Sequence, residues 1–186
     1  MGMGDGRVIR VLGISGSLRR GSSNTALVRA AVRLAPPGVE LSIYSDLANV
    51  PPFNPDLDTD AAPAAVARFR AALQHSDAVL ISSPEYAHGV SGVLKNALDW
   101  IVSSGELIDM PIALINASAR ATHAHASLCE TLATMSGHVV AEASITIPLT
   151  DAAWDADGNF SDPRFSTMLK SAIDALAQAT RERPAV

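Results

Sequence analysis

Short apolar runs alternate with segments of helical period along the whole chain. The apolar runs predict five strands, at residues 8–14, 39–44, 78–82, 112–115 and 139–147. Most of these runs are continuously apolar and bounded by turn residues, which is typical of strands buried on both faces. The run at 39–44 alternates between apolar and polar residues, and this pattern predicts a strand nearer the edge of the sheet.

The segments between these runs carry apolar stripes with the period of a helix. They predict five helices, at residues 24–34, 62–73, 91–102, 128–135 and 165–176. Alternating strands and helices indicate a parallel sheet covered on both faces, because right-handed crossovers place the helices there. We therefore expect a doubly wound, five-stranded α/β fold in a single domain over residues 1–186, with residues 1–7 flexible.

Two turn-rich segments interrupt the alternation without dividing the domain. Residues 49–58 form a proline-rich loop, and the same strand and helix pattern continues on both sides of it. Residues 148–163 are polar and rich in turn residues, and we expect Trp154 and Phe160 to attach this segment to the body of the domain.

Composition and charge favour a folded protein without a polyanionic partner. Hydrophobic residues make up 48% of the 186 residues and charged residues 18%, which argues against long disordered segments. The formal net charge of −5 gives no electrostatic reason to expect binding to nucleic acid or to an anionic membrane. Any basic site is therefore expected to be local.

Cysteine content and hydropathy indicate the cellular location of the protein. Cys129 is the only cysteine, so the chain can form no internal disulfide, and this favours a reducing environment. No apolar stretch reaches the roughly 18 residues that a membrane span needs. The opening MGMGDGR lacks the apolar region of a secretory signal. These features predict a cytoplasmic protein.

The motif GISGSLRRGSSNTAL, at residues 13–27, lies where the first strand leads into the first helix. In a doubly wound sheet, ligands bind beyond the carboxyl ends of the strands. A helix N-terminus offers unpaired N–H groups and the positive end of a dipole, which suit a phosphate monoester. The motif adds polar and charged donors, namely Ser17, Ser22, Ser23, Asn24 and either Arg19 or Arg20.

Better-known phosphate and nucleophile loops do not fit this motif. Ser22 stands where a Walker A loop has its lysine, and Ser17 stands where a nucleophile elbow has its second glycine. The glycine spacing differs from that of the dinucleotide fingerprint, and the loop has no cysteine. A simpler interpretation stays open, in which Ser22, Ser23 and Asn24 form only a helix cap and a turn.

A second motif, SSPEYAHGVSGVLKNALDW at residues 82–100, follows the third strand. Together with GSLRRGSSNTAL it closely resembles the NADPH-dependent FMN reductase family of flavodoxin-like folds, which includes quinone, chromate and azo-dye reductases. The pattern of strands and helices around the motifs extends the resemblance over nearly the whole chain. It implies a flavodoxin-like arrangement of the sheet.

The resemblance also implies which residues bind FMN. The loop for the phosphate matches Ser17, Arg19, Ser22, Ser23 and Asn24. The turn along the isoalloxazine ring matches Pro84, Glu85, Tyr86 and Ala87. Ser118, in NASAR after the fourth strand, matches a third flavin-contacting loop. The chain departs from the pattern where Ala87 replaces a common asparagine and where ASARAT lacks the usual glycines.

The implied activity is hydride transfer from NADPH, or NADH, to the flavin and on to small acceptors such as free FMN, quinones, azo dyes or metal oxyanions. No protein acid or base is required, so no catalytic residue is expected. The resemblance further implies a homodimer or a tetramer, with a partner oxygenase as a potential recipient of reduced FMN. Two alternatives remain, a flavodoxin-type electron carrier and a flavin-free regulatory module on the same fold.

Several other residues have more than one interpretation. His88 is expected either to face the bound ring or second substrate or to be a solvated loop residue, and Arg120 either to bind the nicotinamide phosphate or to begin a helix. No metal site is expected at His123 and His125, because no third ligand is near them in the sequence. The remaining assignments are Glu85 to loop architecture, Cys129 to the core, and Lys95, Asn96, Asp99 and Trp100 to helix packing and a subunit interface.

Overall fold

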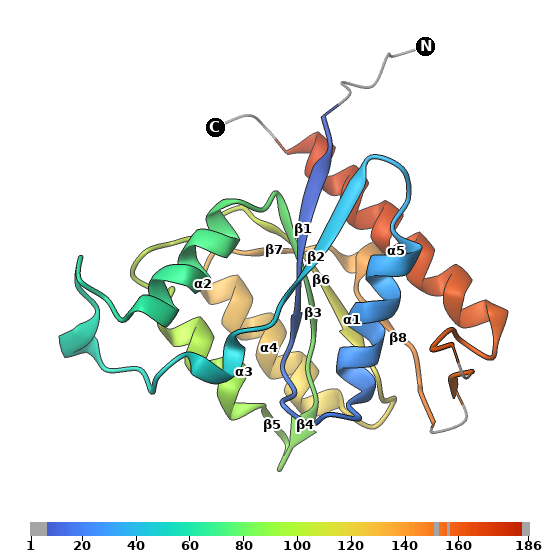
Figure 1. Ribbon diagram of the computed structural model, residues 1–186, viewed down its shortest axis with the longest axis horizontal. Coiled ribbons are helices and arrows are strands. Elements are labelled where there is room, and N and C mark those ends of the chain that lie inside the picture. Colours follow the sequence, from blue (N-terminus) through green and yellow to red (C-terminus); the bar gives the residue numbers. More distant parts are fainter. Residues whose placement is uncertain (1–6, 151–152, 156, 184–186) are drawn as a thin grey trace.

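A parallel β-sheet forms the centre of the computed structural model, which describes residues 7–150, 153–155 and 157–183. Its strands are β1 (Ile9–Ser15), β2 (Val39–Tyr44), β3 (Ala78–Ser82), β6 (Pro111–Asn116), β7 (His138–Val139) and β8 (Ile145–Thr146). The spatial order is β2-β1-β3-β6-β7, with β8 also paired to β6, and every pair is parallel (Figure 1). This order is that of flavodoxin-like folds, so the predicted fold class is confirmed.

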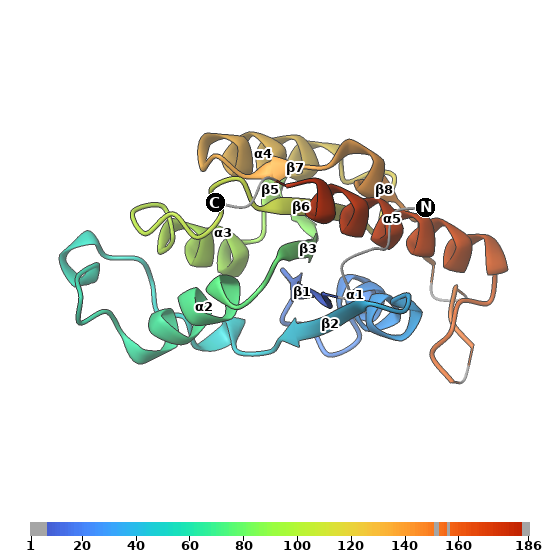
Figure 2. The same cartoon turned by 90° about the horizontal axis from the view of Figure 1, so that it is seen from above.

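Helices cover both faces of the sheet, as predicted. They are α1 (Ser23–Leu34), α2 (Ala64–Gln74), α3 (Gly92–Asp99), α4 (Thr122–Thr134) and α5 (Pro163–Glu182). Helices α1 and α5 pack on one face, and α2, α3 and α4 pack on the other (Figure 2). Successive side chains of a strand point to opposite faces, so Val11 joins the first core and Leu12 the second. This explains why the central strands are continuously apolar.

The prediction of one continuous fifth strand over residues 139–147 is wrong. The chain pairs with β6 through β7, turns through a short 3-10 helix at Ala141–Ala143, and pairs again through β8. The Ser144 hydroxyl accepts a 3.1 Å hydrogen bond from the backbone N–H of Leu114, which lies between the two paired stretches. A side chain thus occupies a ladder position that a strand carbonyl would otherwise fill.

The connecting segments are folded against the domain. The 3-10 helix Leu47–Asn49 leads into the proline-rich loop, and the 3-10 helix Pro55–Leu57 lies within it. In the segment 148–163, Trp154 stacks on Phe160 with ring centroids 4.5 Å apart, and Phe160 is buried in the core beneath α1 and α5. The predicted attachment of this segment is therefore confirmed.

Two further expectations concern the flexible N-terminal segment and the absence of a membrane span. Residues 1–6 of the segment predicted to be flexible lie outside the described residues, and Arg7 forms an ion pair with Asp77. Within the described residues, no helix combines the length and the apolar character that crossing a bilayer requires.

Candidate functional site

The order of the strands reverses between β1 and β3. From β1 the chain crosses to β2 on one side of the sheet, and from β2 it returns past β1 to β3 on the other side. The segments after β1 and β3 therefore leave the sheet in different directions, one toward α1 and the other toward α3, and ligands of open α/β sheets bind beyond the carboxyl ends of strands at such a point. The hairpin formed by β4 (Glu85–Tyr86) and β5 (Gly89–Val90) lies at this edge, at the bottom of Figure 1.

Gly16 brings the loop after β1 against the end of β3. Its backbone N–H donates a 2.8 Å hydrogen bond to the carbonyl oxygen of Ser82. A Cβ at this position would lie 2.4 Å from the Ser83 Oγ and 2.9 Å from the Ser91 Oγ. Only glycine allows this close approach, so the residue type at position 16 determines how tightly the two loops converge.

Hydroxyl groups organise the rest of the β1–α1 loop. Ser22 caps α1, with its Oγ 3.4 Å from the backbone nitrogen of Thr25, and the Ser15 and Thr25 hydroxyls lie 2.7 Å apart. The Ser17 Oγ accepts a hydrogen bond from the N–H of Arg19 at 3.3 Å. Ser17 and Ser22 are both buried. The capping role of Ser22 that the sequence left open is therefore present in the fold.

Two backbone amides of the first turn of α1 have no hydrogen-bond acceptor among the residues that the structure describes. These are the N–H groups of Ser23 and Asn24, which belong to the set that a helix cannot satisfy internally. The Asn24 side chain points inward, where its Oδ1 accepts a 2.9 Å hydrogen bond from the Ser82 hydroxyl. The backbone N–H of Asn24 therefore stays available to a ligand, while its side-chain oxygen ties the helix to β3.

The basic residues of this loop are exposed. Arg19 and Arg20 take part in none of the ion pairs formed by the described residues. Their guanidinium groups, together with the helix dipole, make this part of a net acidic molecule locally positive. These charges and the unpaired amides are suited to binding an anion.

The second loop is a tight hairpin that the sequence did not predict. Its two-residue turn consists of Ala87 and His88, with φ of +49° and +60°, as a type I′ turn requires. Such turns favour Asn-Gly, because most other residues are strained at positive φ. The sequence Ala-His lacks this signal, so the hairpin could not be predicted. Alanine in place of the family's common asparagine at position 87 therefore puts a strained residue in the turn.

Glu85 fastens the hairpin to α4. Its Oε2 accepts a 2.8 Å hydrogen bond from the backbone N–H of Ala124, in the first turn of that helix. This hydrogen bond, with smaller contributions from the nearby His123 and His88, holds the pKa of the Glu85 carboxyl below its ordinary 4.5. The carboxylate acts as a helix cap supplied from another element, which agrees with its predicted architectural role.

The third loop, after β6, is shaped by Asn116. The side chain of Asn116 donates to the carbonyl of Ala121 at 3.0 Å and accepts from the N–H of Ser118 at 3.1 Å. The Ser118 Oγ in turn accepts from the N–H of Arg120 at 3.3 Å. Side-chain hydrogen bonds of this buried asparagine therefore form the turn that glycines were expected to provide.

The structure separates the remaining candidates. His123 packs edge-on against His88 with ring centroids 4.3 Å apart, whereas His125 lines a small cavity of about 20 Å³ beneath α4. Among the described residues, no group of three or more His, Cys, Asp or Glu side chains is arranged to hold a metal ion. Cys129 is half-buried against the core, and burial raises the pKa of its thiol.

The prediction that Trp100 lies at a subunit interface is wrong. The Trp100 side chain is 0% exposed within the protomer. Its Nε1 donates a 2.8 Å hydrogen bond to the carbonyl of Pro51, and the Phe53 ring packs edge-on against it at 5.1 Å. Trp100 therefore holds the proline-rich loop on α3, which confirms the packing role and removes this residue from any contact with a partner.

Comparison with known proteins identifies the family. The sequence profile described as NADPH-dependent FMN reductase matches residues 9–151. The NAD(P)H-dependent FMN reductase of Pseudomonas aeruginosa is 36% identical over 173 residues, which cover 90% of this chain and 93% of that protein. The chain belongs to the NADPH-dependent FMN reductase family.

Two further relatives extend the match. A probable NADPH:quinone oxidoreductase of Oryza sativa is 33% identical, over 96% of this chain and 94% of that protein. The solved structure of FerB, an NAD(P)H:(acceptor) oxidoreductase from Paracoccus denitrificans, superposes with a TM-score of 0.83 and 31% identity, covering 94% of this chain and 98% of that one. The protein is therefore a flavin-dependent NAD(P)H oxidoreductase, with FMN as its cofactor.

The residues present fit this family's cofactor. The unpaired amides of Ser23 and Asn24 and the free guanidinium of Arg19 suit a phosphate dianion. Sequence reasoning missed Ser82, Thr25 and the pairing of Glu85 with α4. The only sequence signal for Ser82 was a polar residue at the end of a continuously apolar strand.

Proposed function

We propose that the protein holds the FMN phosphate at the β1–α1 loop and the ring system along the β4–β5 hairpin, and that it passes electrons from NADPH to quinones. The observation that carries this proposal is the convergence of three loops on the β1–β3 switch point. Gly16 joins the first loop to the second, and Glu85 joins the second to the third. Bound FMN supplies the redox chemistry, and the protein supplies position and electrostatics.

Each predicted binding residue has a role in this arrangement. Ser17 and Ser22 shape the loop, the amides of Ser23 and Asn24 donate to the phosphate, and Arg19 adds a charge-assisted bond. The backbone of Pro84, Glu85, Tyr86 and Ala87 lies along the ring, and Ser118 borders it from the third loop. These assignments rest on the hydrogen bonds that shape the loops and on the chemistry of a phosphate monoester.

Quinones are the acceptor class that the surroundings favour. Tyr86 and Leu18, one in each of the first two loops, are each 56% exposed. Exposed apolar surface beside the proposed flavin site suits a flat aromatic acceptor better than a hydrated oxyanion. The naming of the rice relative as a probable NADPH:quinone oxidoreductase supports the same class. Free FMN, azo dyes and metal oxyanions are the acceptors to compare with quinones.

A two-stage experiment tests the proposal. First, the protein is titrated with FMN, and binding is followed by flavin fluorescence. Second, the loaded protein is mixed anaerobically with NADPH or NADH in a stopped-flow instrument, and each acceptor is then added. Prompt bleaching of the flavin, fastest with NADPH, and reoxidation by a quinone are expected. Bound FMN that does not bleach would instead indicate an electron carrier, and no binding at high micromolar FMN would indicate a flavin-free module.

We propose that the protein assembles as a homodimer through the face around the proline-rich loop. Leu57 and Val102 are 49% and 61% exposed, and the hydrogen bond between Ser103 and Asp58 places their segments side by side. Two such surfaces would bury apolar area if they faced each other. Light scattering after size exclusion distinguishes monomer, dimer and tetramer, and Val102→Asp is expected to shift the protein toward the monomer.

We also propose a cytoplasmic location and a test for a partner. A single cysteine suits a reducing compartment. If FMN dissociates when reduced, the family's chemistry would serve a partner oxygenase. Anaerobic equilibrium dialysis of FMN before and after reduction decides between a released and a retained cofactor.

A further inference from the structure

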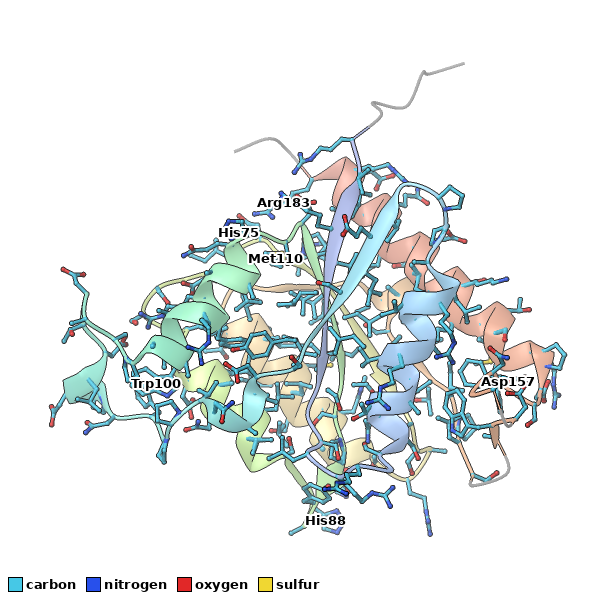
Figure 3. All side chains as sticks on the ribbon, viewed as in Figure 1. His75, His88, Trp100, Met110, Asp157 and Arg183 are labelled. Atoms are coloured by element: carbon cyan, nitrogen blue, oxygen red, sulfur yellow. The ribbon has the colours of Figure 1, made fainter. Side chains whose placement is uncertain are left out.

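His88 occupies the tip of the β4–β5 hairpin, at the edge of the domain where the loops of the site converge. Figure 3 shows it at the bottom of the molecule, at the opposite end from His75 and Arg183. The side chain is 75% exposed, and the backbone φ is +60°. A type I′ turn commonly has glycine at this second position, so an imidazole here is held at a conformational cost.

The imidazole is oriented by a carboxylate. The Nδ1 of His88 lies 3.2 Å from Oε1 of Glu85, while the other carboxylate oxygen accepts the N–H of Ala124. Glu85 is only 12% exposed at its side chain, so it is a fixed partner rather than a mobile surface charge. When Nδ1 faces the carboxylate, Nε2 is the nitrogen directed away from the hairpin.

Among the residues that the structure describes, two titratable groups contact His88 from the elements packed around it. Glu85 faces it from β4, and His123 faces it from α4 with its ring edge-on. Only one of the two rings lies within ion-pair distance of Glu85, and that ring belongs to His88.

The proposed reaction needs a proton that the nicotinamide donor does not bring. Reducing a quinone to a hydroquinone consumes two electrons and two protons. Oxidation of NADPH delivers a hydride, which carries both electrons and one proton, so the second proton comes from another donor. Hydroxyl and guanidinium groups, which make up most of the polar side chains of the three loops, do not release a proton near neutral pH.

We propose that His88 is the proton donor to the quinone oxygen, with Glu85 as its positioning residue. This inference rests on the quinone reductase function proposed above. The imidazolium gives its Nε2 proton to the oxygen, becomes neutral, and regains a proton from water. Glu85 fixes which nitrogen of the ring faces the acceptor.

The kinetic test compares two acceptors. A benzoquinone requires a proton, whereas ferricyanide accepts an electron without one. In His88→Asn, which tolerates positive φ, the ratio of quinone to ferricyanide turnover is expected to fall about a hundredfold, the lower end for a general acid. In the wild type the same ratio should fall as the pH rises, and this decline should be absent in His88→Asn. His75→Asn, at the remote end of the domain, is the control and should leave the ratio unchanged.

A second readout does not depend on turnover. In the FMN-free protein above neutral pH, ¹⁵N NMR of the imidazole rings reports which nitrogen of His88 carries its proton. The Nδ1–H tautomer is expected, because Nδ1 is the nitrogen that lies 3.2 Å from the Glu85 carboxylate. The Nε2–H tautomer, typical of a solvated histidine, would overturn the proposal.

The outcomes separate this proposal from the function on which it rests. If ferricyanide is reduced but the quinone ratio is unchanged in His88→Asn, the proton-donor role is wrong and the oxidoreductase function stands. If neither acceptor is reduced with NADPH, the proposed function fails, and the role of His88 fails with it.

Discussion

The Ser82 hydroxyl donates a 2.9 Å hydrogen bond to the side-chain oxygen of Asn24, 58 residues earlier in the chain. Both residues are buried, so the bond ties the end of β3 to the first turn of α1 inside the domain. The same turn presents the amides assigned to the FMN phosphate. A contact within the core therefore sets the position of the amides proposed to bind the phosphate.

Ser82→Ala should destabilise the protein and loosen this turn. The change leaves the Asn24 oxygen buried without its donor, which is expected to lower the free energy of unfolding by about 1–3 kcal/mol. Urea unfolding measures the loss, and FMN titration should show weaker binding. Ser45→Ala, at an exposed hydroxyl, is the matched control and should change stability by less than about 0.5 kcal/mol. Equal effects of the two substitutions would contradict the role given to Ser82.

Gly16→Ala should disrupt the contact between the first two loops. The new Cβ would meet the Ser83 and Ser91 side chains at less than 3.0 Å, and relieving such overlap is expected to cost about 1–3 kcal/mol of unfolding free energy. Gly21→Ala, five residues along the same loop, adds a Cβ with nothing within 4 Å. Its stability should be unchanged or slightly higher. Thermal or urea unfolding of both variants tests this difference, and similar losses would show that loop flexibility, not close approach, explains the glycine at position 16.

Much of the fold was predictable because burial on both faces leaves a direct mark on the sequence. The continuous runs of β1, β3 and β6 and the stripes of α1 and α5 correspond to the elements observed. The prediction of a continuous fifth strand failed because an apolar run does not reveal that the Ser144 hydroxyl, and not a backbone carbonyl, accepts the N–H of Leu114. Periodicity reports which residues are buried, but not which hydrogen bonds their backbone makes.

The site was predictable only where its chemistry lies within one loop. The β1–α1 motif carries its own glycine, hydroxyls and arginines, so the anion site could be inferred locally. Glu85 and Ala124 are 39 residues apart, and their hydrogen bond depends on how the hairpin packs on α4. The turn at Ala87 and His88 gave no signal, since Ala-His is not one of the Asn-Gly or Asp-Gly pairs that mark a two-residue hairpin turn.

Ala87→Gly should stabilise the protein, although glycine usually destabilises. At φ of +49°, alanine is strained, and removing its Cβ is expected to raise the free energy of unfolding by about 1 kcal/mol. The same substitution at Ala126, an exposed position in the middle of α4, should lower it by about 0.5–1 kcal/mol. A higher urea midpoint for Ala87→Gly and a lower one for Ala126→Gly would confirm the type I′ turn. A lower midpoint for both variants would argue against it.

Glu85→Gln should remove a pH-dependent part of the stability. Because the hydrogen bond from Ala124 lowers the pKa of Glu85 in the folded state, its ionised form stabilises the protein above the unfolded-state pKa, and this contribution is lost as the pH falls through the folded-state pKa. The amide of the variant keeps an acceptor for the N–H but has no charge. The wild type should thus be more stable than Glu85→Gln at pH 7, and the difference should shrink as the pH is lowered below 4.5. Urea unfolding at a series of pH values measures this, and a difference that does not vary with pH would exclude the charge as its cause.

Arg19→Ala should weaken the binding of FMN by about 1.5–3 kcal/mol, the range for a hydrogen bond to a charged group. The guanidinium of Arg19 is exposed and takes part in none of the described ion pairs, so its removal should leave the fold intact. Riboflavin has the same ring system without the phosphate, and its weaker binding should be nearly indifferent to the substitution. Fluorescence titrations of the wild type and the variant with both ligands give the comparison. A loss of similar size for riboflavin would place Arg19 against the ring or in the folding of the loop, and the phosphate site would then have to be assigned to other donors.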